Sequence, residues 1–268
     1  MLSIVIMNYK NAPLLRLCLK SLQRVIPASF AHEIIVVDAS ASADTAHVAT
    51  HEFPSVHYIP FKENVGYTKG VNAGLKAAQG DVMFVINPDI IALEGSLEKM
   101  YAYMKAHPEI GLLGPQLLNF DGTRQQSCFR FYTPFTIVYR RTFLGKLPFV
   151  KKITDRFLMK DKDLTHTLNV DWLMGSALMI SQKALTKAGY MDEQLYLYFS
   201  DVDWPRRFWE NGYTVVFYPD AQMYHYHRRE SRGALDAFDA IFNRRTQQHI
   251  KDGIRYFRKN GIRESSYA

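Results

Sequence analysis

The first third of the chain alternates between short apolar runs and helix-like segments, and this alternation constrains the fold more than any other feature. The runs are rich in β-branched residues, whereas the segments between them repeat apolar residues at helical spacing. Apolar strands separated by helices predict a parallel sheet covered on both faces. The predicted strands are LSIVIMNY, HEIIVVDAS, VHYIPF and DVMFVI, and the predicted helices are APLLRLCLKSLQRV, DTAHVATHEF and GYTKGVNAGLKAAQG.

After Ile90 the elements become less regular. EGSLEKMYAYMKAHP predicts an amphipathic helix, and IGLLGPQLLNFDGT predicts a strand with a turn at Asp121-Gly122. The aromatic and basic residues 129–162 predict helix and loop. Further predicted elements are a glycine-broken strand VDWLMGSALMIS, helices in QKALTKAGYMDE and QLYLYFSDVDWPRRFWENGY, the strand TVVFYP, and a long tail helix from Leu235 with Phe238, Ile241, Phe242, Ile250, Ile254 and Phe257 at helical spacing.

Length and cysteine content restrict the class of protein. The chain has 268 residues, 47% of them hydrophobic, which suffices for one large domain or two small ones. Its two cysteines, Cys18 and Cys128, cannot form a disulfide framework, so a reducing compartment is expected. The N-terminus lacks the pattern of a signal peptide, and no apolar run approaches the ~20 residues of a membrane helix.

The positive charge is concentrated in two regions. The chain carries a net charge of +7, with eight Lys/Arg against two Asp in residues 140–162 and ten Lys/Arg against five Asp/Glu in residues 228–268. Two basic regions in an otherwise acidic chain indicate an anionic partner, such as phosphates, a nucleic acid or a membrane surface. Solubility alone is the simpler explanation.

Polar residues follow three of the predicted strands. Asn8 comes after the first strand, Asp38 after the second, and Asn87 and Asp89 after the fourth. A single polar residue in such a place is usually a turn former. Because the carboxyl ends of parallel strands share one edge of the sheet, and ligands bind there, the set instead indicates a site.

Two later clusters could add chemistry to that site. In YFSDVDWPRR, Asp201 and Asp203 lie among aromatic residues, which would raise a carboxyl pKa and suit a general base, although capping a helix would explain one of them. In YHYHRRES, His225 or His227 could join Asp89 in an oxygen and nitrogen site for Mg²⁺ or Mn²⁺. Walker A, G-x-S-x-G, G-x-G-x-x-G and zinc spacings are absent from the sequence.

Five segments, taken in order, resemble the motif series of family 2 glycosyltransferases, above all the rhamnosyltransferase branch of bacterial surface polysaccharide synthesis. The resemblance extends from Ser3 to Ser231. Its segments are SIVIMNYKN, IIVVDASASAD, NVGYTKGVNAGLKAAQGDVMFVINPDI, VDWLMGSALMI and GYMDEQLYLYFSDVDWPRRFWENGYTVVFYPDAQMYHYHRRES.

The resemblance implies the GT-A fold, a Rossmann-like, mostly parallel α/β sheet flanked by helices. It implies a glycosyltransferase domain over residues 1–231, with a nucleotide-binding half (1–90) and an acceptor and catalytic half (91–231), followed by a basic amphipathic helical tail (232–268). The implied reaction is an inverting transfer from a nucleoside diphosphate sugar, dTDP-β-L-rhamnose by analogy with the branch. A UDP-sugar donor remains the alternative.

The resemblance also assigns roles to individual residues. Asn87 would face the nucleotide, Asp89 would bind the metal, and Asp38 would recognise the base. Asn8, Gly66 and Lys69 would surround the nucleotide and diphosphate. His225 would complete the metal site, with His227 as its competitor. Asp201 would be the catalytic base, and Trp172, Gly175, Ser176 and Asp203 would lie near the acceptor or donor sugar, with core packing equally open for Trp172 and a supporting role for Asp203.

Two departures from the family pattern keep other functions open. Ser200 replaces a glutamate that often precedes the presumed base, and Ala39 replaces an asparagine. A sugar-binding relative without catalysis is therefore one alternative, and a nucleic-acid-binding protein that uses the basic regions is another.

The partners implied by the resemblance are a nucleotide sugar and a glycan or lipid-diphosphate-linked acceptor, with no nucleic acid. The basic tail further predicts a cytoplasmic protein with a peripheral contact at the inner membrane face. A tail helix packed on the domain is the competing interpretation.

Overall fold

A computed structural model describes residues 1–141, 147–226, 244–261 and 267 of this chain. The expected tail positions Leu235, Phe238, Ile241 and Phe242 lie outside these residues, as does His227. The described strands are β1 (Leu2–Asn8), β2 (His32–Asp38), β3 (His57–Pro60), β4 (Val82–Ile86), β5 (Ile90–Ala92), β6 (Ile110–Leu118), β7 (Cys128–Phe129), β8 (Leu168–Asn169), β9 (Trp172–Leu173), β10 (Ala177–Ser181) and β11 (Thr214–His225).

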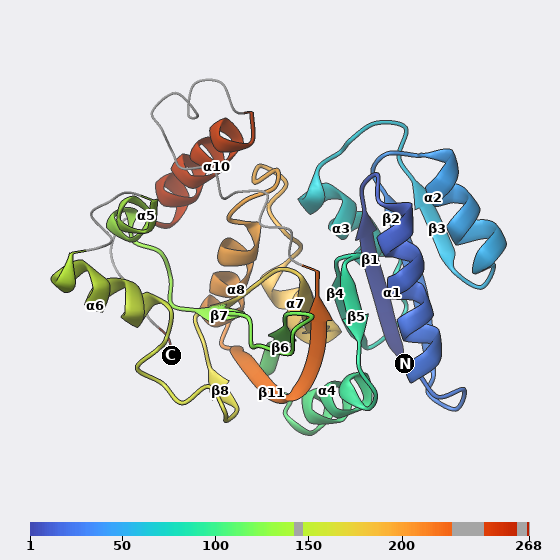
Figure 1. The fold of residues 1–268 in the computed structure, drawn as a ribbon, viewed down its shortest axis with the longest axis horizontal. Coiled ribbons are helices and arrows are strands. Elements are labelled where there is room, and N and C mark those ends of the chain that lie inside the picture. Colours follow the sequence, from blue (N-terminus) through green and yellow to red (C-terminus); the bar gives the residue numbers. More distant parts are fainter. Residues whose placement is uncertain (142–146, 227–243, 262–266, 268) are drawn as a thin grey trace.

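Helices alternate with these strands, as the sequence predicted for the first third of the chain (Figure 1). They are α1 (Ala12–Val25), α2 (Ala43–His47), the π-helix η1 (Val48–Glu52), α3 (Tyr67–Ala77), α4 (Ser96–Ala106), α5 (Pro134–Arg141), α6 (Pro148–Phe157), α7 (Gln182–Ala188), α8 (Ser200–Glu210) and α10 (Arg244–Asn260).

One large sheet runs through the molecule in the strand order β3-β2-β1-β4-β10-β6-β11-β5, with β8 paired to β11. β1 to β4 pair in parallel, and β6 pairs in parallel with β11. β10 runs antiparallel between β4 and β6, and the short strands β5 and β8 run antiparallel to β11. The expected mostly parallel sheet is confirmed. Its antiparallel strands, β5, β8 and β10, all follow β4, in the part of the chain for which no strand direction was predicted.

Side-chain alternation along the strands divides the core into two layers. One layer joins Ile4 and Ile6 of β1 to apolar residues of α1 and α4, and the other joins Val5 and Met7 to residues of α3, α7 and α8. Successive side chains of a strand point to opposite faces, so a strand buried on both faces must be apolar throughout. This requirement explains the runs without polar alternation.

A third, aromatic layer lies at the end of the molecule that carries α5, α6 and α10 (Figure 1). It is formed by buried residues of the small β7–β9 sheet, α6, α8 and α10 together with Leu195, and it includes Phe129, Phe157, Trp172, Phe199 and Tyr256. The C-terminal helix thus packs on the body of the protein through Tyr256, which is 1% exposed. No helix in the described part of the chain is long and apolar enough to cross a membrane.

Candidate active site

The paired ends of β1 and β2 hold Asn8 and Asp38 opposite each other in parallel register. Both side chains are fully buried. Asn8 Nδ2 donates to Thr45 Oγ1 at 3.1 Å and lies 3.5 Å from Asp38 Oδ1. Asp38 accepts hydrogen bonds from the backbone and hydroxyl of Ser40, the backbone N–H of Ser42 and the hydroxyl of Tyr58. The Asp38 carboxylate therefore fixes the shape of the loop after β2.

The turn after β4 holds Asn87 beside the loop that leads into β10. The Asn87 N–H donates to the Ser176 carbonyl at 3.0 Å, and the Ile90 N–H donates back to the Asn87 carbonyl at 3.2 Å. Because β10 is antiparallel to β4, its first residue, Ala177, pairs with Ile86 at the end of β4. This pairing brings Gly175 and Ser176 to the same rim as Asn87 and Asp89.

Asp89 is the more unusual residue of this turn. Its side chain is 23% exposed, and its Oδ1 atom is buried with no hydrogen-bond partner among the described residues. Burial raises the pKa of Asp89 to about 6. A buried carboxylate oxygen without a donor is costly in isolation, so its surroundings suit a cation.

His225, at the end of β11, points toward Asp89. Its Nε2 atom lies 3.6 Å from Asp89 Oδ2, and the Tyr226 N–H donates to the Asp89 carbonyl at 2.9 Å. On the other side of the ring, His225 Nδ1 lies 2.9 Å from Gln125 Oε1. Gln125 Nε2 donates to the carbonyl of His225 and to Asn119 Oδ1, both at 2.8 Å.

These bonds determine the tautomer of His225. Because the Gln125 amide nitrogen faces acceptors, its Oε1 atom must be the acceptor for His225 Nδ1–H. In the neutral ring Nε2 then carries the lone pair that faces Asp89, which is the form that binds metals. Asp89 and His225 could therefore contribute one oxygen and one nitrogen ligand. No group of three His, Cys, Asp or Glu suited to a metal occurs in the described part of the chain.

Asp201 lies in the first turn of α8 and faces the loop before β10. Its Oδ2 atom accepts a hydrogen bond from the Gly175 N–H at 3.2 Å, and a Cβ built on Gly175 would lie 3.0 Å from the Cβ of Asp201. Glycine at 175 is what allows this approach. Burial raises the pKa of Asp201 to about 6, which is unusually basic for an aspartate.

Tyr67, at the start of α3, binds the loop before β10 that also contacts Asp201. Its hydroxyl donates to the Gly175 carbonyl at 2.8 Å. Burial raises the pKa of the Tyr67 phenol, and the nearby charges of Asp201 and Asp89 raise it further. The phenol thus stays protonated and donates to this loop.

The start of α3 also carries Gly66 and Lys69. Gly66 has a φ of 82°, and a Cβ built there would lie 2.6 Å from ring carbons of Tyr196, so a side chain would be strained and crowded. Lys69 is exposed on the first turn of the helix. Basic charge at a helix N-terminus is suited to an anionic ligand.

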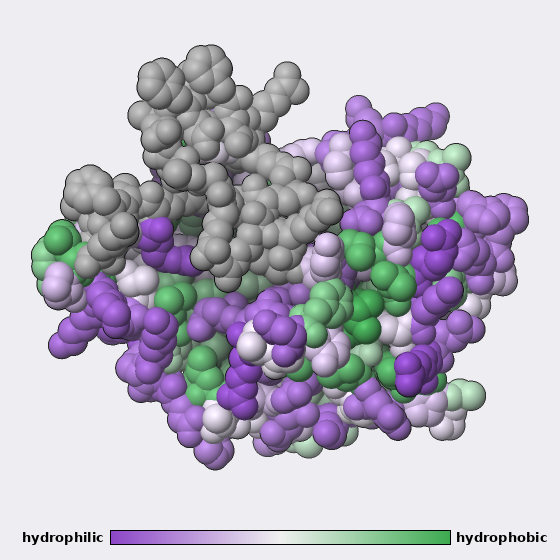
Figure 2. All heavy atoms as spheres, viewed as in Figure 1, coloured by the Kyte–Doolittle hydropathy of each residue, from purple (hydrophilic) through white to green (hydrophobic). Residues whose placement is uncertain are grey.

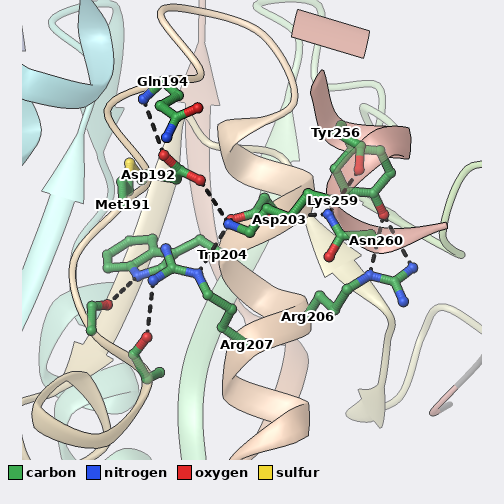
Figure 3. A network of polar contacts seen from close by, with 12 residues as sticks. Met191, Asp192, Gln194, Asp203, Trp204, Arg206, Arg207, Tyr256, Lys259 and Asn260 are labelled. Atoms are coloured by element: carbon green, nitrogen blue, oxygen red, sulfur yellow. Dashed lines mark hydrogen bonds and ion pairs between the residues drawn. The ribbon is translucent and has the colours of Figure 1, made fainter. Parts of the chain in front are cut away.

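Two predicted residues lie elsewhere. The Trp172 ring stacks on Phe129 with centroids 4.3 Å apart and is 5% exposed, and its Nε1–H donates to the Arg130 carbonyl. Its contacts are those of core packing. Asp203 is 1% exposed and faces α10, where it contacts Lys259 and Asn260 (Figure 3).

Sequence reasoning missed Tyr67 and Gln125. Tyr67 stands in the quoted segment NVGYTKG, directly after Gly66, so its place at the start of a predicted helix was a usable signal. The sequence contains no comparable signal for Gln125, because this residue reaches His225 only where β11 approaches the segment after β6. The site therefore unites two carboxylates of raised pKa, a histidine and a phenol, an arrangement suited to metal binding and proton transfer.

Comparison with known families identifies one match over most of the chain. The sequence profile described as Glycosyl transferase family 2 matches residues 3–164. An N-acetylglucosaminyl-diphospho-decaprenol L-rhamnosyltransferase from Mycobacterium tuberculosis (strain CDC 1551 / Oshkosh) is 27% identical over 244 residues, which is 87% of this chain and 78% of the relative.

A second relative and a solved structure extend the comparison. The amylovoran biosynthesis glycosyltransferase AmsE of Erwinia amylovora is 26% identical over 255 residues, 94% of this chain and 81% of the relative. A crystal structure of GalNAc-T7 with UDP, GalNAc and Mn²⁺ superposes with a TM-score of 0.68 at 14% identity. The match covers 96% of this chain but 48% of GalNAc-T7, and it establishes a shared fold.

Proposed function

This chain belongs to glycosyl transferase family 2, and we propose that it transfers a sugar from a nucleoside diphosphate donor to a hydroxyl of a cell-surface glycan under synthesis. One observation carries the proposal: at the carboxyl rim of the sheet, the Gly175–Ser176 loop accepts a hydrogen bond from Asn87 in the turn of Asp89 and donates one to Asp201, and burial raises the pKa of both aspartates. Transfer between oxygens needs an anion-stabilising group and a base on opposite sides of one carbon, and the two carboxylates provide these roles.

Asp201 is the proposed base. Once it is ionised, its free carboxylate oxygen can accept the proton of the acceptor hydroxyl while that oxygen attacks the anomeric carbon. The bond to the donor diphosphate breaks as the new glycosidic bond forms, so a single displacement inverts the anomeric centre. The Gly175 N–H holds the other oxygen of Asp201 and so orients the base.

Asp89 and His225 are the proposed protein ligands of a divalent cation, Mg²⁺ or Mn²⁺. The unpartnered Asp89 Oδ1 and the Nε2 atom of His225 fit such an ion, and diphosphate oxygens would supply further ligands. When bound, the cation stabilises the negative charge that develops on the leaving diphosphate. Gln125 keeps His225 in the metal-binding tautomer, and Lys69 adds positive charge near the start of α3.

L-Rhamnose from dTDP-β-L-rhamnose is the proposed donor sugar. The support is the name of the mycobacterial relative, an L-rhamnosyltransferase, over 87% of this chain. A UDP-sugar is the alternative, and the superposition on GalNAc-T7, whose structure contains UDP, GalNAc and Mn²⁺, motivates testing it.

A lipid-diphosphate-linked glycan on a membrane surface is the proposed acceptor. The mycobacterial relative is named for a diphospho-decaprenol substrate. In this chain α5, α6 and α10 expose large apolar side chains, namely Phe135, Phe149, Ile153, Ile250 and Ile254. Figure 2 shows hydrophobic side chains at the α6 end bordered by hydrophilic ones, a pattern suited to an anionic membrane surface.

A donor panel tests the function. The purified chain is heated with dTDP-rhamnose, UDP-glucose, UDP-N-acetylglucosamine or GDP-mannose, each with and without Mn²⁺, and the melting temperature is recorded. Turnover is then measured with a prenyl-diphosphate-linked N-acetylglucosamine acceptor. We expect stabilisation by dTDP-rhamnose that depends on Mn²⁺, and turnover that disappears in Asp201→Asn while donor binding persists.

The outcomes separate the parts of the proposal. Stabilisation by a UDP-sugar alone would replace the donor and keep the reaction. Unchanged turnover in Asp201→Asn would refute the base, and donor binding unaffected by a chelator would refute the metal site. If no nucleotide sugar binds and none is turned over, transfer itself is wrong.

A further inference from the structure

The segment 192–199, here called the strap, connects α7 to α8 and leads directly to Asp201. Its last residue, Phe199, has a φ of 62°, and its carbonyl accepts hydrogen bonds from the N–H groups of Val202 and Asp203. The Phe199 ring is 3% exposed. A non-glycine residue in the left-handed region persists only where its surroundings hold it, so the start of α8 depends on what surrounds the strap.

One side of the strap rests on helix α3. The Tyr67 N–H donates to the Tyr196 carbonyl at 3.1 Å, and the Thr68 hydroxyl donates to the Leu195 carbonyl. Further back along the chain, Asn72 Nδ2 donates to the Met191 carbonyl. The start of α3 is therefore tied to the strap by backbone and side-chain bonds.

The other side rests on α10 through Asp252. This aspartate is fully buried, and its Oδ2 atom accepts the N–H groups of Leu197 at 3.2 Å and Tyr198 at 3.1 Å. Its Oδ1 atom accepts a hydrogen bond from Gln248 Nε2 at 2.8 Å. Burial of a carboxylate is costly unless hydrogen bonds compensate, and here two of the compensating donors are backbone groups of the strap.

Neighbouring positions of α10 reinforce this contact. A Cβ built on Gly253 would lie 3.1 Å from the Phe199 ring, so the absence of a side chain lets the ring pack on the helix. Lys259 Nζ contacts Asp192 at 2.8 Å and Asp203 at 2.9 Å, and Asn260 donates to Asp203 at 3.0 Å (Figure 3). The helix thus holds both ends of the strap as well as its middle.

We propose that α10 positions the catalytic base, and that Asp252 is the positioning residue that fixes the strap from which Asp201 projects. The inference rests on the proposed function only in naming Asp201 the base. The contacts between α10 and the strap stand independently of it. Asp252 acts through backbone N–H groups and touches neither donor nor acceptor.

Substitution of Asp252 separates positioning from folding. Asp252→Ala leaves the N–H groups of Leu197 and Tyr198 without their acceptor, whereas Asp252→Asn retains one oxygen that can accept both, with a reoriented Gln248 amide. Lys251→Ala, on the exposed face of the same helix, is the matched control. Leu22→Ala, which changes a fully buried residue of α1 far from the strap in sequence, controls for a loss of folding stability alone.

Two experiments are needed. The first measures amide hydrogen exchange of a peptide spanning residues 195–203. The second measures kcat and the dissociation constant for the nucleoside diphosphate. In Asp252→Ala we expect exchange about tenfold faster or more, kcat lower by about 10- to 100-fold per folded molecule, and nucleotide affinity within about twofold of wild type. Asp252→Asn should restore both readouts to near wild type. Lys251→Ala should change neither, and Leu22→Ala should lower only the melting temperature.

Each contrary result has a distinct meaning. Unchanged exchange in Asp252→Ala would overturn the proposed anchoring of the strap. Faster exchange with unchanged kcat would overturn the positioning role. An equal loss in Leu22→Ala would reduce the effect to general destabilisation and also overturn it. If the wild-type protein turns over no nucleotide sugar, the proposed function fails while exchange still decides whether Asp252 holds the strap.

Discussion

Burial of Asp89 and Asp201 sets the acid–base chemistry of this site. The pKa of an aspartate in water is about 4. Burial raises the pKa of both side chains here to about 6. A base of that pKa is strong enough to take a hydroxyl proton as the transition state forms, yet is still ionised at neutral pH. The same burial would make Asp89 a carboxylate that gains much from binding a cation.

The first residue-scale prediction concerns pH. The proposed base Asp201 can accept a proton only when it is deprotonated, and burial raises its pKa to about 6, so kcat/KM should fall as the pH drops below about 6. Turnover measured at saturating Mn²⁺ from pH 4.5 to 8 checks this, since saturation limits the contribution of Asp89. An acidic limb centred near pH 4, the ordinary value, would contradict the assignment.

The second residue-scale prediction concerns Gln125. Replacing it with leucine removes the acceptor that keeps His225 in the metal-binding tautomer, so Mn²⁺ affinity should fall by about 10- to 100-fold. Calorimetric titration of Mn²⁺ in the presence of UDP measures the effect without turnover. Gln125→Glu, which keeps an oxygen opposite His225 Nδ1, should lose much less. Equal affinities for Gln125→Leu and wild type would show that Gln125 does not hold His225 in the metal-binding tautomer.

At the same scale, the sequence predicted best the residues that directly follow strands. Asn8, Asp38, Asn87 and Asp89 could be placed on one rim because parallel strands put their carboxyl ends together. Tyr67 and Gln125 depend on contacts across a hundred residues or more, which no local pattern encodes. Trp172 was open between two roles, and only its stacking in the aromatic core distinguishes them.

At the scale of elements, the loops that meet at the rim matter more than the helices and strands themselves. The antiparallel direction of β10 brings Gly175 beside Asp201, and the left-handed Gly66 lets α3 start against Tyr196. Both glycines permit backbone approaches that a side chain would prevent. They allow the start of α3 and the loop before β10 to pack closely on the residues around Tyr196 and Asp201.

The prediction at this scale is that Gly66→Ala costs about 1–3 kcal/mol of unfolding free energy and weakens nucleotide binding. The reason is a φ of 82° combined with a Cβ 2.6 Å from the Tyr196 ring. Denaturant unfolding and calorimetry with dTDP or UDP measure the two effects. Gly122→Ala is the matched control, because Gly122 has a φ of 80° with nothing within 4 Å of its Cβ. Equal costs at the two glycines would exclude a role for the Tyr196 contact.

The hydrophobic pattern of the sequence predicted well where helices and strands occur. It did not predict the direction of the strands or which elements pack together. The strands β1 to β4 and the helices between them match the predicted segments. Helix α8 lies in its predicted segment but starts only at Ser200, because Phe199 has a positive φ. The packing of α10 depends on a buried aspartate, which apolar periodicity cannot reveal.

At the scale of the whole molecule, apolar and basic residues share one end. Helices α5, α6 and α10 lie there together, at the end of the molecule opposite β1, β2 and β3 (Figure 1). Phe149 is 65% exposed and Ile254 is 47% exposed, while Lys152 and Arg258 add positive charge to the same helices. A membrane that is both apolar and anionic complements such a surface, and its contact would bring the protein to a lipid-linked acceptor.

The prediction is therefore that the protein sediments with phosphatidylglycerol-rich vesicles and much less with phosphatidylcholine vesicles. Phe149→Ser should weaken this binding by about tenfold or more, since the ring would no longer be buried in lipid. Phe120→Ser is the matched control, because Phe120 is 58% exposed on the turn after β6. Equal binding to both lipids, or an equal loss in both variants, would argue against this surface.

The packing of α10 on the strap has a consequence for how this protein has diverged from its relatives. The Phe199 ring fills the space left open at Gly253, and Asp203 is matched to Lys259 and Asn260. A side chain at position 253 would clash with the ring at position 199, whereas a change at Lys259 would leave Asp203 with Asn260 and with Arg207, whose Nε atom lies 3.2 Å from Asp203 Oδ2. Across related sequences we therefore expect positions 199 and 253 to co-vary, and positions 203 and 259 to do so less strictly. A catalytic segment exchanged between relatives should work only when its own C-terminal helix is exchanged with it.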